Sequence, residues 1–404
     1  MSLRTASEEP GAVSRRIPEL DGIRGLAILS VLIWHYFVAT ANPAPGSFAS
    51  YAKSILSLSW SGVDLFFVLS GFLIGGILLE QREAANYFKV FYIRRTCRIF
   101  PLYFFLLLLF VLLINLMPSL TVTSPIKWLF QNSLPAWTYA TFTQNIAMSY
   151  SGNFGSMWLG VTWSLAVEEQ FYLLMPVAIY FVPRRWLPYA LVGAIMAAPV
   201  LRFALFFIHP LPRFSAYVLM PCRADVLLLG VLCAYVTQHP RLAQYLIRKR
   251  RILYGLFILL SIGVGAILAY LVMTNSTGPF AIHSFAYTWL ALLYACFLLI
   301  AVTGKRGVLS AVTRVKWLRD LGSISYGVYI YHEVVLGLTH TLLFRQAPQV
   351  KRWTDGFINL VALIVTLLVS HLSWKFFEKP IVAFGHSFQY IKTAPPEAVQ
   401  RAAA

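Results

Sequence analysis

Long hydrophobic stretches recur along almost the whole chain and are separated by short polar connections. A transmembrane helix needs roughly 20 mostly apolar residues, and about ten stretches reach that length. They are 20–40, 61–81, 99–117, 161–182, 187–208, 216–237, 251–273, 283–303, 321–343 and 356–377. The pattern predicts an all-α polytopic membrane protein with about ten transmembrane helices.

The distribution of basic residues predicts how these helices are oriented. The 404-residue chain carries 33 Lys and Arg against 15 Asp and Glu, a net charge of +18. The basic residues cluster at alternate connections, for example within 82–98 and 241–251. Because Lys and Arg concentrate on the cytoplasmic side of membrane proteins, both termini are expected in the cytoplasm. The excess charge then encodes orientation and does not indicate a nucleic-acid partner.

The chain is expected to contain one folded unit. Residues 17–385 form the predicted membrane domain, and the tails 1–16 and 386–404 are predicted to be disordered. The four cysteines show no paired spacing, and we find no cluster of His, Cys, Asp and Glu with metal-ligand spacing. We therefore expect neither a disulfide framework nor a bound metal.

The longest predicted outer connection, 118–160, is rich in aromatic residues and poor in charges. Such a segment is expected to lie at the membrane interface. Two interpretations stay open for it, a lid over an acceptor site and a simple interfacial anchor.

The first predicted helix carries ionisable residues where a simple anchor would not. Arg24 and His35 are eleven residues apart, so at roughly 100° per residue they share a helix face, about 16 Å apart along the axis. Ionisable groups in a membrane helix are costly unless they face protein or a wet cavity, and they mark a functional site by default. His35 is therefore a candidate catalytic residue. Asp64, near the outer end of the second helix, is a candidate to orient it.

The fourth predicted helix begins at Trp163 and carries two adjacent carboxylates. Ser164 and Glu168 are four residues apart and share a face, whereas Glu169 points about 100° away. A buried carboxylate beside His35 would favour the imidazolium and fix the ring orientation. The alternative is that the pair simply complements the positive end of the helix dipole.

The ninth predicted helix carries Ser325, Tyr329 and His332 on one face, at helical spacing. His332 lies near the middle of the membrane in this prediction. It is either a functional group or a core histidine that bridges two helices.

Two arginines follow the second helix on the cytoplasmic side. Arg95 and Arg98 are three residues apart and share a helix face. Two guanidinium groups on one face suit bidentate binding of phosphate, although an ordinary cytoplasmic anchor has the same composition. A phosphate-rich cytoplasmic ligand would fit this pair.

Seven segments, in order along about residues 17–380, resemble motifs of the integral-membrane acyltransferase-3 family. They are Arg24-x10-His35, GVDLFFVLSG at 62–71, RTCRIFPLY at 95–103, WSLAVEEQFY at 163–172, RAD at 223–225, ISYGVYIYH at 324–332 and FEKP at 377–380. The resemblance implies transfer of an acyl group, commonly acetyl, from acyl-CoA to a hydroxyl of a carbohydrate or glycoconjugate. It also implies a multi-pass protein of a bacterial-type cytoplasmic membrane, with acyl-CoA as a co-substrate and no bound cofactor.

The resemblance further implies roles for the residues singled out above. His35 either abstracts the acceptor proton or takes the acyl group itself. The candidates to orient His35 are Glu168, Asp64 and Glu169. The candidates to hold the CoA phosphates are Arg24, Arg95, Arg98 and Arg223. The candidates for acceptor binding or oxyanion stabilisation are Ser325, Tyr329, His332, Trp163 and Ser164.

A proton-coupled transporter, or a flippase of a lipid-linked sugar, is the main alternative. Intramembrane Arg, His, Asp and Glu residues also mark proton pathways. We find no inverted internal repeat of the kind that many transporters contain, which favours the acyltransferase. Turnover of acyl-CoA would distinguish the two.

Overall fold

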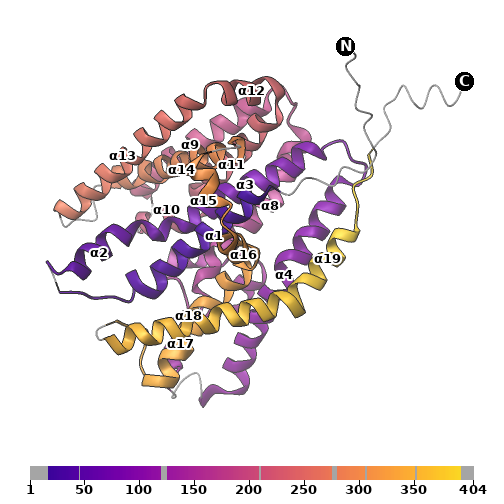
Figure 1. The fold of residues 1–404 in the computed structure, drawn as a ribbon. Coiled ribbons are helices and arrows are strands. Elements are labelled where there is room, and N and C mark those ends of the chain that lie inside the picture. Colours follow the sequence, from indigo (N-terminus) through magenta and orange to yellow (C-terminus); the bar gives the residue numbers. More distant parts are fainter. Residues whose placement is uncertain are drawn as a thin grey trace, which may run out of the picture.

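The computed structural model describes residues 17–44, 46–119, 125–208, 211–274, 280–304, 307–350 and 353–392. Within these ranges every regular element is helical (Figure 1). The predicted tail 1–16 and the final part of the predicted tail 386–404, from residue 393 onward, lie outside the described residues.

Ten long helices make up most of the fold. They are α1 (Pro18–Ile33), α3 (Gly62–Glu80), α4 (Tyr87–Leu116), α8 (Trp163–Phe181), α9 (Leu187–Ile208), α11 (Met220–Gln238), α13 (Arg250–Thr274), α14 (Phe280–Thr303), α17 (Ser325–Phe344) and α18 (Trp353–Ser373). Shorter helices connect them. These are α2 (Phe48–Leu56), α6 (Ala136–Ala140), α7 (Gln144–Ser151), α10 (Pro212–Val218), α12 (Pro240–Arg248), α15 (Val308–Thr313), α16 (Lys316–Ser323) and α19 (Lys379–Ser387). Five single turns complete the set: η1 (Trp34–Val38), η2 (Ser57–Ser61), η3 (Lys127–Leu129), η4 (Gly160–Thr162) and η5 (Trp374–Glu378).

Eight helical runs of the described chain are long and apolar enough to cross a membrane. They are Pro18–Val38, Phe48–Glu80, Tyr87–Leu116, Leu187–Ile208, Arg213–Gln238, Arg250–Tyr270, Ser284–Thr303 and Thr354–Ser387. The protein is therefore a multi-pass, all-helical membrane protein. The two remaining predicted stretches, 161–182 and 321–343, form α8 and α17, but polar residues such as Glu168 and His332 lower their hydropathy.

Closely packed helices form the centre of the molecule. In Figure 1, α9, α13 and α14 lie on one side and α4, α18 and α19 on the other, with α1 and α3 between them. The α3 and α11 backbones touch where Gly71 and Gly230 have no side chain. A Cβ atom on Gly71 would overlap the carbonyl oxygen of Leu227, and one on Gly230 would overlap that of Val68. Small residues permit this close approach of membrane helices.

The described part of the predicted C-terminal tail contacts the start of α4. The Ile391 N–H donates to Asn86 Oδ1 (2.9 Å), and the Arg94 guanidinium donates to the carbonyl oxygen of Phe388 (2.6 Å). These contacts involve only the part of the predicted tail that the structure describes, up to residue 392.

Candidate functional site

His35 lies in the π-helical turn η1, which continues α1. Such turns are frequent at functional sites. The Nδ1 atom of His35 lies 3.0 Å from the carbonyl oxygen of Val31 and 3.2 Å from Nε2 of His332. Its Nε2 atom lies 3.2 Å from Oε1 of Glu333. His35 is thus the middle member of a chain of three polar side chains, two of them from α17.

The hydrogen-bond partners fix the tautomers of this chain. Nδ1 of His332 lies 2.7 Å from the Tyr329 carbonyl oxygen, so it carries a proton, and Nε2 of a neutral His332 is an acceptor. His35 Nδ1 must then be a donor, toward His332 and Val31. Nε2 of a neutral His35 is left as an acceptor that faces Glu333. One shared proton satisfies this last contact, so His35 and Glu333 act as a proton-sharing pair.

The same three side chains have ligand atoms within 4.8 Å of one another, which is close enough to surround a metal ion. Their geometry favours the hydrogen-bonded chain, however. His332 approaches His35 at Nδ1 and Glu333 approaches it at Nε2. A metal ion binds an imidazole through one nitrogen, so one ion cannot replace both contacts.

His35 and Glu333 line a cavity of about 460 Å³ that we call the outer cavity. The rest of its lining comes mainly from the predicted outer connection and the start of α8. These residues are Trp128, Gln131, Asn132, Phe154, Gly155, Met157, Gly160, Val161 and Trp163. Residues of this connection therefore line the cavity that contains His35.

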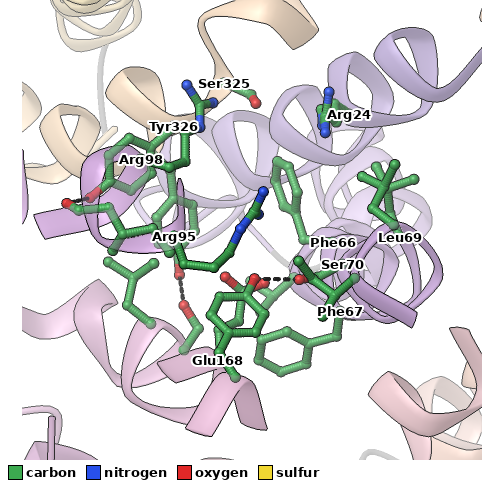
Figure 2. A pocket seen from close by; sticks show the side chains of 18 residues that line it. Arg24, Phe66, Phe67, Leu69, Ser70, Arg95, Arg98, Glu168, Ser325 and Tyr326 are labelled. Atoms are coloured by element: carbon green, nitrogen blue, oxygen red, sulfur yellow. Dashed lines mark hydrogen bonds between the residues drawn. The ribbon is translucent and has the colours of Figure 1, made fainter. Parts of the chain in front are cut away.

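A second cavity of about 140 Å³, which we call the inner cavity, contains three of the predicted phosphate-binding arginines. Figure 2 shows Arg24, Arg95 and Arg98 around it, with Glu168 and Ser70 among the side chains that face them. The remainder of its lining is largely apolar and aromatic, from α3, α4, α8 and α17. A cationic group of residues thus opens into an apolar interior.

Aromatic rings hold Arg98 in place. Its guanidinium lies 5.6 Å from the ring centre of Tyr326 and 5.2 Å from that of Trp374, distances typical of cation–π contacts. Trp374 belongs to η5, a second π-helical turn. Tyr326 in turn donates to the carbonyl oxygen of Ile99 (2.6 Å). Arg98 is therefore positioned before any ligand binds.

Tyr329, Ser164 and Val161 separate the two cavities, and we call these residues the partition. The Tyr329 hydroxyl donates to the Val161 carbonyl oxygen (2.9 Å) and lies 2.6 Å from Ser164 Oγ. Tyr329 and Ser164 line the inner cavity, whereas Val161 lines the outer one. The Tyr329 side chain thus lines one cavity while its hydroxyl contacts the backbone of a residue that lines the other.

The other predicted acceptor or oxyanion residues lie around the partition. Ser325 lines the inner cavity and Trp163 the outer one. His332 is completely buried and contacts His35. The structure therefore brings all five of these predicted residues together.

Asp64 and Arg223 lie elsewhere than the sequence analysis placed them. We expected Asp64 beside His35 and Arg223 among the phosphate-binding arginines. In the structure they form a buried ion pair with each other, because α3 and α11 pack closely, and neither lines the inner or the outer cavity. The ring of Tyr287 covers the Arg223 guanidinium at 4.4 Å.

Neither of the predicted carboxylates Glu168 and Glu169 forms a described contact with His35. Glu168 lines the inner cavity beside Ser70 and Tyr172, whose hydroxyl groups lie 2.5 Å apart. Among the described contacts, the carboxylate against His35 belongs to Glu333. The only signal for Glu333 in the sequence was an acidic residue in the middle of an apolar helix.

The sequence analysis also missed a buried ion pair between α9 and α11. Arg202 donates through Nη1 and Nη2 to the two carboxylate oxygens of Asp225, at 3.1 and 2.9 Å. Thr288 of α14 contacts the same carboxylate at 2.6 Å. Together with the Asp64–Arg223 pair, this ion pair gives two buried positive and two buried negative side chains. The two pairs join α3, α9 and α11, and Thr288 joins α14 to them.

This multi-pass membrane protein thus places a half-buried histidine–carboxylate pair in one cavity beside a second cavity lined by arginines. The sequence pattern of the acyltransferase-3 family, described as an acyltransferase domain, matches residues 17–375, and the chain belongs to this family. The resemblance seen in the sequence motifs is thereby confirmed.

Named relatives support the same family. The chain is 28% identical over 385 residues to the peptidoglycan O-acetyltransferase OatA of Listeria monocytogenes, an alignment that covers 90% of this chain and 56% of the relative. It is 26% identical over 384 residues to the O-acetyltransferase OatA of Staphylococcus aureus, covering 91% of this chain and 57% of the relative. The chain thus spans slightly more than half the length of these relatives. No solved structure matches it.

Proposed function

We propose that this protein is a membrane O-acyltransferase that moves an acetyl group from acyl-CoA to a hydroxyl of a carbohydrate. The names of the relatives suggest a polymer such as peptidoglycan as the acceptor. The observation that carries the proposal is the His35–Glu333 pair, which lines one cavity, while Tyr329 and Ser164 of the partition line a neighbouring cavity that contains three arginines.

The inner cavity suits an acyl-CoA donor. Arg24, Arg95 and Arg98 supply guanidinium groups for phosphate oxygens, with charge-assisted hydrogen bonds. Beyond them the lining becomes apolar, with Phe66 and Leu73 among its residues, as the uncharged pantetheine arm requires. The acyl end of such a donor reaches the partition.

The reaction we propose is a direct transfer. In the competent state the proton shared by His35 and Glu333 has passed to solvent in the outer cavity, which leaves Glu333 ionised. His35 Nε2 then takes the proton of the acceptor hydroxyl, whose oxygen attacks the thioester carbonyl carbon. The new C–O bond forms, the C–S bond breaks, and the imidazolium returns its proton to the CoA sulfur. Glu333 stabilises the imidazolium by its charge. The Tyr329 hydroxyl, once it leaves Val161, donates to the oxyanion.

The proposal includes a topology with ten spans and both termini in the cytoplasm. The polar faces of α8 and α17 then turn toward the two cavities, which makes their crossing tolerable in lipid. This orientation places Arg95 and Arg98 toward the cytoplasm and His35 toward the outer side. Residues 17–385 form the membrane domain of this proposal.

The test is turnover of radiolabelled acetyl-CoA by the purified chain in lipid nanodiscs, with chitotetraose present as acceptor and His35→Ala beside the wild type. We expect CoA release by the wild type and a loss of about 100-fold or more in the variant. Label retained on the protein would favour acyl transfer to His35 itself over direct transfer. No turnover, together with substrate counterflow in vesicles, would replace the proposal by the transporter.

A further inference from the structure

The outer cavity combines aromatic rings with free amide groups. Trp128, Phe154 and Trp163 supply the rings, and Gln131 and Asn132 supply the amides. Both amide residues are exposed, and neither side chain is hydrogen-bonded to another residue of the described chain. The volume of about 460 Å³ lies within the range typical of ligand pockets, ~300–1,000 Å³. The cavity therefore offers hydrogen-bonding groups that a ligand has yet to satisfy.

The turn that carries the two amides is held rigidly. Asn132 has a φ of 57°, in the left-handed region, which asparagine tolerates better than most residues. The backbone N–H of Trp158 donates to the Leu129 carbonyl oxygen (3.1 Å), and the Trp158 ring stacks on Phe130 with centroids 5.2 Å apart. Strained backbone conformations that the surroundings enforce are common at binding sites. The backbone of the turn thus places both amide side chains at the outer cavity.

The Trp128 ring is also fixed, against α17. Its Nε1–H donates to Thr341 Oγ1 (3.0 Å). A Cβ atom on Gly337 would lie 2.8 Å from the ring, so the ring fits there because residue 337 has no side chain. Gly337 is one helical turn after Glu333. The ring therefore lies next to the turn of α17 that carries the carboxylate.

The charges of the lining distinguish between possible ligands. The described residues that line the outer cavity include no Lys or Arg, whereas three arginines line the inner cavity. Glu333 is the only acidic residue among them. An anionic ligand would find no Lys or Arg partner among these residues and would be repelled by an ionised Glu333. An uncharged ligand with hydroxyl groups and an apolar face fits instead.

We propose that the outer cavity is the acceptor subsite and that it binds an uncharged sugar residue, with Gln131 and Asn132 as its hydrogen-bonding groups. This inference rests on the proposed acyltransferase function and deepens it. The rings of Trp128 and Phe154 pack against the C–H face of the sugar. One hydroxyl then points toward His35 Nε2, where its proton is removed.

The experiment compares two acceptor probes with the full-length chain in nanodiscs and radiolabelled acetyl-CoA. The neutral probe is chitotetraose and the anionic probe is tetragalacturonate. The variants are Gln131→Ala, Asn132→Ala and Asn132→Gly, because glycine keeps the left-handed backbone while removing the amide. Asn115→Ala, an exposed amide on α4 away from the cavity, is the matched control.

We expect label on chitotetraose and little on tetragalacturonate. Each amide variant should raise the apparent KM for chitotetraose by about fivefold or more, as loss of a hydrogen bond predicts, and more than it raises the KM for acetyl-CoA. Asn132→Gly should match Asn132→Ala, and Asn115→Ala should match the wild type.

Several results would overturn the subsite. They are a preference for the anionic probe, hydrolysis of acetyl-CoA without transfer to chitotetraose, or an unchanged KM for chitotetraose in all three variants. A wild type that neither hydrolyses nor transfers from acetyl-CoA would instead overturn the proposed function itself.

Discussion

The Nε2 atom of His35 lies 3.2 Å from the Oε1 atom of Glu333, across the contact between η1 and α17. On the opposite edge of the same ring, His332 Nε2 lies 3.2 Å from His35 Nδ1. The orientation of the His35 imidazole therefore depends on two consecutive residues of another helix. In the proposed reaction, α17 therefore supplies both side chains that orient the His35 ring.

Replacing Glu333 by Gln is expected to lower kcat by about 100-fold. The amide keeps the shape of the side chain but removes the charge that stabilises the imidazolium, and acid–base catalysis contributes roughly 10²–10⁴ in rate. CoA release measures kcat and the KM for acetyl-CoA. Glu83→Gln is the control, since Glu83 is exposed and pairs with Arg184 at the surface. Wild-type kcat in Glu333→Gln would contradict the role of Glu333.

Replacing Arg98 by Ala should mainly raise the KM for acetyl-CoA. Hydrogen bonds to charged groups contribute about 1.5–3 kcal/mol, which corresponds to about 10- to 100-fold in affinity. Arg98→Lys should recover only part of the loss, because lysine cannot reproduce the planar contact between Tyr326 and Trp374. The comparison is made with Arg184→Ala. An effect on kcat alone would argue against phosphate binding by Arg98.

Asp64 and Arg223 are expected to affect folding more than catalysis. Removing one partner of a buried ion pair leaves an unpaired charge and costs about 3–5 kcal/mol of stability. Asp64→Leu and Arg223→Met should each lower the Tm in detergent, and the double variant should recover most of the loss. If Arg223→Met instead keeps its Tm and raises the KM for acetyl-CoA, the arginine belongs to the donor site after all.

If the partition keeps water away from the thioester, weakening it should increase the hydrolysis of acetyl-CoA relative to acetyl transfer. Tyr329→Phe keeps the ring but loses the hydrogen bonds to Val161 and Ser164. Water from the outer cavity should then reach the thioester more easily. We expect a higher ratio of acetyl-CoA hydrolysis to acetyl transfer, with Ser164→Ala changing the ratio in the same direction. The two products are separated by chromatography, and an unchanged ratio in both variants would show that the partition does not exclude water.

Helical spacing and hydropathy predicted much of this architecture from the sequence. The apolar stretches correspond to the long helices, and the Arg24–His35 face leads from the inner cavity to the outer one. These features depend on local periodicity. The sequence also indicated Arg95 and Arg98, which share a face and line the same cavity.

The partners of these residues could not be predicted, because they depend on which helices are neighbours. Asp64 and Glu333 are both acidic residues in apolar helices, and nothing local shows that the first meets Arg223 and the second His35. The same holds for Gln131 and Asn132. They are two amides in a long connection, and only the folded chain places them in one cavity with a histidine of η1.

The partition between the two cavities determines where CoA and the acetyl group end up in the proposed reaction. CoA, with its phosphates held among arginines, never needs to leave the cytoplasmic pool, while the acetyl group departs on the opposite side. The chemistry becomes vectorial: a small group is exported without a carrier protein and without an activated donor in the outer compartment. Export and bond formation are then a single event, so acetyl-CoA is spent only when an outer hydroxyl is in place.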